Sequence, residues 1–106
     1  MNHWLTKVPD KIFLWDIDGI YIGYYYLQSQ SKHFVGPSGF LGKSIQEVLP
    51  TEAAHTVKEC LTLALKTKQT QIAEIHLPLD GLPYTQIIRF VPYEDRVLGL
   101  VNDHPT

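Results

Sequence analysis

The chain has 106 residues, which is the size of a single domain. Apolar residues make up 44% and charged residues 19%, so the composition excludes a disordered chain and a coiled coil. Nine basic residues against eleven acidic ones give a net charge of −2, and such a chain lacks the clustered positive charge that nucleic-acid binding needs. No apolar run is long enough for a membrane span and no secretory apolar core follows Met1, so we expect a cytoplasmic domain.

The first predicted elements are a flank and a hairpin. Residues 1–11 are mostly polar, and we expect them to form a short helix or a tail. Ile12–Asp16 and Ile20–Gln28 are rich in β-branched and aromatic residues, which is typical of strands. Asp18 and Gly19 between them are a strong turn signal, so the two runs are predicted to form a hairpin.

The second strand of this hairpin is aromatic on both sides. By the two-residue period of a strand, one face carries Ile20, Ile22, Tyr24 and Tyr26, and the other carries Tyr21, Gly23, Tyr25 and Leu27. Neither face is strongly polar, so we expect both to be covered.

Helices are predicted in the middle of the chain. Ser44 and Glu47 fit the S-x-x-E capping box of a short helix that ends at Pro50. A longer helix is predicted over Thr51–Thr67, with Thr51 as its cap, because apolar residues recur there at three- and four-residue spacing.

Three strands are predicted to follow, over Gln71–Leu79, Tyr84–Tyr93 and Val97–Asn102. In the middle strand, one face carries Tyr84, Gln86, Ile88 and Phe90, and the other carries Thr85, Ile87, Arg89 and Val91. Because no helix separates these strands, they should pair antiparallel through hairpins. The fold class is therefore α+β, with a five-stranded antiparallel sheet and helices packed on one face.

Short fragments in this order and at this spacing are similar to those of one family. They are Asp16-x-Asp18-Gly19-Ile20, Phe40-Leu41-Gly42-Lys43-Ser44-Ile45, Glu47-Val48-Leu49-Pro50, Leu61–Thr67, Asp80-Gly81, Arg89-Phe90-Val91-Pro92 and Val97–Asp103. From Phe13 to Asp103 the chain resembles a PAS domain, the sensor module of many bacterial signalling proteins such as histidine kinases and diguanylate cyclases.

The resemblance implies a sensory or dimerisation module that is not itself catalytic. The domain would span residues 12–103, with residues 104–106 as the junction to a C-terminal effector and Asp103 as the point of signal output. Two residues depart from the family. Pro105 opposes a helix that continues from Asp103, and Lys68 stands where family helices often end in Gly, so another residue is expected to make that C-cap.

A ligand pocket between the sheet and the long helix is a further expectation. Its candidate residues are Tyr24, Tyr26, Phe40, Val57, Leu61, Ile75, Ile88 and Arg89. The tyrosine hydroxyls could orient a small polar ligand, or they could belong to an ordinary sheet stripe. Arg89 could bind a ligand carboxylate, or it could lie on the sheet surface and pair with Glu74 or Asp103.

The resemblance also raises the question of a cofactor, whose identity the sequence leaves unknown. Haem-binding relatives use a ligand from the long helix, but their position is nearer Val57 than His55, so haem is an unfavoured alternative. Flavin is unfavoured too, because Cys60, the single cysteine, lies outside the flavin-binding motif and fits a small core residue. His33, His76 and His104 lack the spacing of a metal site, so no metal is expected.

The alternative to a ligand sensor is a homodimerisation module without a ligand. Trp4, Leu5 and Val8 would form a helix that packs on the outer sheet face of a second copy. That face would carry Tyr21, Tyr25, Ile87 and Val91. An enzyme is not expected, because Asp16 and Asp18 fit a strand end and a turn, and no phosphate loop or nucleophile motif is present.

Overall fold

The computed structural model describes residues 8–26, 37–79 and 82–105. The elements follow in the order β1 (Lys11–Trp15), β2 (Tyr21–Tyr26), the 3-10 helix η1 (Pro37–Gly39), α2 (Ile45–Val48), α3 (Thr51–Thr67), β3 (Gln71–Leu79), β4 (Leu82–Tyr93) and β5 (Arg96–Pro105). This order confirms the predicted α+β class with five strands and one long helix.

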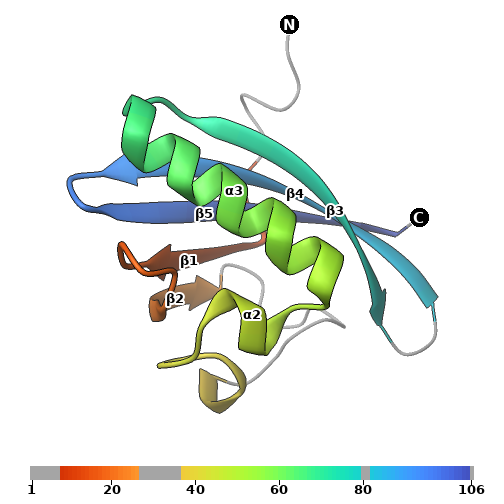
Figure 1. Cartoon of the computed structure of the whole chain (residues 1–106). Coiled ribbons are helices and arrows are strands. Elements are labelled where there is room, and N and C mark those ends of the chain that lie inside the picture. The colour runs from red at the N-terminus through yellow and green to blue at the C-terminus, as the bar shows by residue number, and fades with distance from the viewer. Residues whose placement is uncertain (1–7, 27–36, 80–81, 106) are drawn as a thin grey trace, which may run out of the picture.

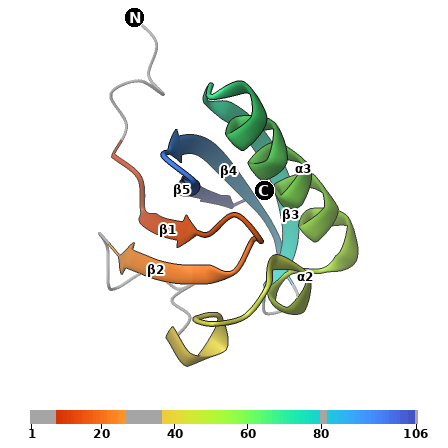
Figure 2. The same ribbon diagram turned by 60° about the vertical axis from the view of Figure 1, so that its left-hand side comes forward.

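The five strands form one antiparallel sheet in the spatial order β2-β1-β5-β4-β3. Both helices lie on the same side of this sheet, and α3 runs across β3, β4 and β5 (Figures 1 and 2). The first and last strands are therefore neighbours in its centre. The last strand is longer than the sequence predicted, because His104 and Pro105 still pair with β4.

Asp16 organises the first hairpin turn. Its Oδ1 accepts hydrogen bonds from the backbone N–H groups of Asp18 and Ile20, each at 2.9 Å. Gly19 has a φ of 78°, a left-handed conformation that glycine adopts at little cost. The Asp16-x-Asp18-Gly19 fragment is thus explained by turn geometry, with the carboxylate of Asp16 satisfying two backbone donors.

A β-bulge changes the faces of the second strand. Leu14 pairs with Gly23 but Trp15 pairs with Tyr21, so Ile22 is an extra residue in β2. Tyr21 therefore shares a face with Trp15 and is only 3% exposed. The prediction that Tyr21 lies on the outer face is wrong, because the two-residue period assumed a strand without a bulge.

The caps of the helices follow the sequence in part. The capping box is present, since Glu47 N donates to Ser44 Oγ at 3.2 Å and Ser44 N donates to Glu47 Oε1 at 3.0 Å. In α3, however, Pro50 rather than Thr51 occupies the N-cap position. Lys68 itself is the C-cap, with a φ of 61° and its N–H bonded to Ala64, so the expectation that another residue makes this cap is wrong.

The core lies between α3 and the inner face of the sheet, which is the face that the helices cover. Its buried apolar residues are Trp15, Tyr21, Phe40, Ile45, Ala53, Ala54, Val57, Leu61, Ala64, Ile75, Leu77, Ile88, Phe90, Val97 and Val101. Gly99 lies directly under the Trp15 ring, and a Cβ added there would overlap that ring. The glycine thus allows the close approach of strand and indole.

Candidate functional site

Four polar side chains are buried where β1, β4 and β5 meet. Lys11, Tyr84 and Gln86 are 7%, 4% and 7% exposed, and the side chain of Asp103 is 8% exposed. The alternation of the strands places them on the inner face, in line with the core residues of their own strands. We call Lys11, Tyr84, Gln86 and Asp103 the polar cluster.

Asp103 is at the centre of the polar cluster. Its Oδ2 lies 3.3 Å from Lys11 Nζ, and its Oδ1 accepts a hydrogen bond from Gln86 Nε2 at 3.0 Å. Its backbone N–H donates to Asp10 Oδ2 at 2.7 Å. A buried ion pair is tolerated when additional hydrogen bonds satisfy its atoms, and the Gln86 amide supplies one here.

The carboxylate of Asp103 contributes to the raised pKa of two tyrosines. Burial first, and then the carboxylate of Asp103, raise the pKa of Tyr84 above its ordinary range. Burial, the neighbouring Tyr24 and Asp103 raise the pKa of Tyr26 to about 12. Both hydroxyls therefore stay protonated at physiological pH and can donate as well as accept hydrogen bonds.

Aromatic rings fill the inner face beside the polar cluster. Phe13 packs edge-on against Phe40 with ring centroids 5.1 Å apart, and against Tyr26 at 6.3 Å. Tyr24 lies 5.3 Å from Tyr26 and 5.5 Å from Phe40, but it is 42% exposed. Tyr26 thus connects an aromatic wall to the charged end of the same face.

The structure brings most of the predicted pocket residues together. Phe40, Val57, Leu61, Ile75 and Ile88 are all buried in the one core between α3 and the sheet. Tyr26 packs against that core, and Tyr24 lies at its edge.

Arg89 does not line this interior. It follows the core residue Ile88 in β4 and therefore lies on the opposite face of the sheet, beside Ile72 and Leu100 in register. Asp103 lies on the inner face and pairs with Lys11, so the suggested Arg89–Asp103 pair is wrong. The strand period by itself separates Arg89 from Ile88, which favours the sheet surface, the alternative to the pocket for Arg89.

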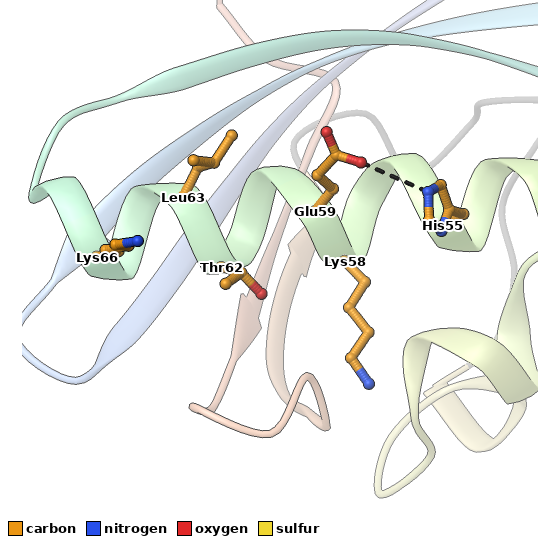
Figure 3. A pocket seen from close by; sticks show the side chains of 6 residues that line it. All are labelled: His55, Lys58, Glu59, Thr62, Leu63 and Lys66. Atoms are coloured by element: carbon orange, nitrogen blue, oxygen red, sulfur yellow. Dashed lines mark ion pairs between the residues drawn. The ribbon is translucent and has the colours of Figure 1, made fainter.

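His55 points away from the interior. Its side chain is 81% exposed, and its Nε2 lies 3.5 Å from Glu59 Oε2 on the same helix (Figure 3). Both residues border a shallow depression on the outer side of α3, with Lys58, Thr62, Leu63 and Lys66. Val57 is fully buried against the sheet. A haem between helix and sheet would therefore find no ligand in His55.

The remaining residues singled out in the sequence are Cys60, Trp4, Leu5 and Val8. Cys60 is half-buried against the core, and burial and Glu59 raise the pKa of its thiol. Trp4 and Leu5 lie outside the described residues, and Val8 is 66% exposed. Within residues 8–26, 37–79 and 82–105, no three metal-binding side chains gather into a site.

Sequence reasoning missed most of the polar cluster. Gln86 carried a usable signal, because it is a polar residue at a core-facing position between Tyr84 and Ile88. Lys11 had been assigned to the flank, although it is the first residue of β1. Three strands build the cluster, so it has no local spacing pattern.

Comparison with known families adds to this geometry. The family described as PAS fold matches residues 5–103, which is nearly the whole chain. The chain belongs to the PAS-fold family. None of the helices in the described part of this PAS domain is long and apolar enough to cross a membrane.

Several solved structures share the fold of this PAS domain at low sequence identity. The PAS domain of the quorum-sensing receptor RpfR from Cronobacter turicensis, in complex with BDSF, has a TM-score of 0.71 at 11% identity, over 92% of this chain and 95% of that one. A sensory box histidine kinase from Vibrio cholerae has a TM-score of 0.62 at 18% identity, over 97% and 87%. A domain of an HTR-like protein from Haloarcula marismortui also reaches 0.62, at 17% identity over 90% and 97%. A search of curated proteins gave no match.

Proposed function

We propose that this PAS domain is a sensory module that binds a small ligand at the polar cluster. The resulting change in the contacts of Asp103 would be transmitted through the end of β5. The observation that carries the proposal is the placement of Asp103. It lies on the inner face near the end of β5 and contacts both Lys11 and Gln86 through its side chain. A similar domain bound to BDSF supports the idea that the fold accepts small ligands.

The mechanism is competition for the partners of Asp103. A ligand that hydrogen-bonds to Gln86 or Tyr84 would replace contacts that these side chains make to the carboxylate. The ion pair of Asp103 with Lys11 and the hydrogen bond from its backbone N–H to Asp10 would then change. The coupling equals the difference in ligand affinity between the two arrangements. The domain itself would not be catalytic, and a C-terminal effector would receive the change.

The test is native mass spectrometry of the purified chain. Ligand binding predicts extra mass that disappears on denaturation, or that appears when a small-molecule library is added. Gln86→Leu should lose this mass, because the amide donor is gone while the side-chain volume is nearly kept. Arg89→Leu is the matched control on the other face of the same strand and should retain the mass. No adduct with any library member, or equal retention by both variants, would contradict the proposal.

Homodimerisation through the outer sheet face is a second candidate, favoured by the apolar character of that face. These partly or fully exposed side chains point away from α3: Ile12, Leu14, Tyr25, Ile72, Ile87, Val91, Leu98 and Leu100. Antiparallel sheets with a solvated face usually carry polar residues there. Trp4, Leu5 and Val8 of each copy would pack on this face.

A charge introduced on the outer sheet face should dissociate a dimer that forms through this face. Leu100→Glu places a carboxylate in the middle of β5 on this face, and sedimentation should then report a monomer. Thr62→Glu on the exposed side of α3 is the control and should remain dimeric. A Leu100→Glu chain that sediments as the wild type does would refute this interface, and a dimeric chain without residues 1–8 would refute the role of the flank.

A further inference from the structure

The two edges of the sheet are protected differently. At the β2 edge, Tyr21 N donates to Lys43 O at 3.0 Å and Gly42 N donates to Tyr21 O at 2.9 Å. Ile20 forms a bridge with Ser44 just before this strand, and the bulge at Ile22 twists it. The start of β2 is therefore covered by the chain itself, which is how natural proteins commonly block edge pairing.

The β3 edge has no such cover among the described residues. All nine residues of Gln71–Leu79 pair with β4 in one uninterrupted register. No other described strand pairs with β3, which borders the sheet (Figure 1). An edge strand of this length presents outward N–H and C=O groups that can accept another strand.

The exposed side chains of β3 place a carboxylate on one side of Ile75 and an imidazole on the other. Glu74 and His76 flank it, point to the outer face, and are 61% and 68% exposed. Their Oε2 and Nε2 atoms lie 3.9 Å apart, and His76 Nδ1 lies 3.2 Å from Thr85 Oγ1 on β4. In an antiparallel pair of two copies centred on Ile75, each Glu74 would stand directly opposite the His76 of the other copy.

We propose that the β3 edge is an interaction surface for a second copy of this chain, paired antiparallel about Ile75. The register is selective. A pair centred on Glu74 would place two carboxylates opposite each other, and like charges directly opposite are destabilising. A shift of one residue would turn the buried Ile75 side toward the exposed side of its partner. This surface is separate from the outer sheet face and independent of any ligand.

Disulfide trapping tests the register directly. In a Cys60→Ser background, Glu74→Cys with His76→Cys places a thiol opposite a thiol across the two-fold axis. Directly opposite strand residues have Cα atoms about 4.5–5.5 Å apart, which is within disulfide range. Oxidised glutathione should then give a cross-linked dimer. The matched control, Ile72→Cys with Glu74→Cys, is equally exposed but out of register and should cross-link at least about tenfold less. Equal cross-linking of the two pairs would overturn the proposal.

Charge exchange supplies a second test by sedimentation equilibrium. His76→Glu sets like charges opposite each other and should weaken the dimer about tenfold, since two symmetric pairs are lost. The double variant Glu74→His with His76→Glu restores opposite partners and should regain most of that loss. A wild type that stays monomeric at every concentration, or a double variant as weak as the single one, would reject the β3 pairing. Leu100→Glu should leave the β3 cross-link intact, which distinguishes this interface from the outer-face dimer.

Discussion

At the scale of single residues, two contacts in the interior are sensitive to small changes. Gly99 lets β5 pass under Trp15, and Lys11 neutralises Asp103 in a buried setting. Neither residue has a bulky apolar side chain, so neither stands out as a core residue in the sequence. Each has a role that depends on one neighbour, and each role can be measured.

Gly99→Ala should destabilise the fold. The new methyl group would overlap the Trp15 ring, and overpacking of this kind costs about 1–3 kcal/mol. Urea denaturation measures the change in the free energy of unfolding. Adding Trp15→Leu to Gly99→Ala relieves the overlap, so the alanine should cost less in that background. An alanine that costs the same with and without the indole would show that the strain arises elsewhere.

Lys11→Met should cost about 3–5 kcal/mol, because it leaves Asp103 buried without its cation. Lys11→Met combined with Asp103→Asn removes both charges and should be more stable than Lys11→Met alone. Chemical denaturation of the two single variants, the double variant and the wild type gives the coupling free energy. Additive effects would mean that the two side chains do not interact.

At the scale of elements, local signals predicted the helices and strands better than the caps of α3 or the face of Tyr21. The alternation in β3 to β5 and the helical spacing of α3 led to the correct elements, because those patterns are regular over many residues. Tyr21 was misplaced because a single extra residue, Ile22, reverses the alternation. The polar cluster was missed because its members come from three strands and become neighbours only when the sheet forms.

Ser44→Ala tests the capping box of α2. The substitution removes the acceptor for Glu47 N and should cost about 1 kcal/mol. Glu47→Gln is the control, since glutamine can still accept from Ser44 N and should change the stability much less. Thermal unfolding of both variants measures the difference. Equal losses would mean that the charge of Glu47, whose pKa these hydrogen bonds lower, contributes as much to the capping box as the hydroxyl of Ser44 does.

At the scale of the whole molecule, the raised pKa values of Tyr21 and Tyr26 make stability depend on pH in the alkaline range. Burial raises the pKa of Tyr21 to about 12, and burial with the neighbouring Tyr24 raises the pKa of Tyr26 to about 12 as well. An unfolded tyrosine titrates near about 10, so above that pH the folded state holds more protons than the unfolded state. The contribution of these tyrosines to the free energy of unfolding is therefore fully present below about pH 10, and it should be lost as the pH rises toward 12.

Denaturant unfolding at a series of alkaline pH values tests this dependence. Tyr21→Phe and Tyr26→Phe should each make the loss of stability with pH less steep, because one raised pKa is removed. Tyr25→Phe is the control, since Tyr25 is 61% exposed, and its profile should follow the wild type. If all three variants kept the wild-type slope, titration of the buried phenols would not explain the alkaline loss.

The adjacency of β1 and β5 has a mechanical consequence. These strands are antiparallel neighbours, so the start of β1 at Lys11 lies at the same end of the sheet as the last residues of β5. A force that pulls the two flanks apart would act on one end of the β1–β5 pairing. The hydrogen bonds between these strands would then break one after another from that end, and not all at once. The first contacts to bear that tension are the hydrogen bonds from Asn102 Nδ2 to Val8 O at 2.9 Å and from Asp103 N to Asp10 Oδ2 at 2.7 Å. The Lys11–Asp103 pair and the hydrogen bond from Asp10 N to Val101 O at 2.8 Å follow. A pull on the two flanks would thus open the centre of the sheet from this end.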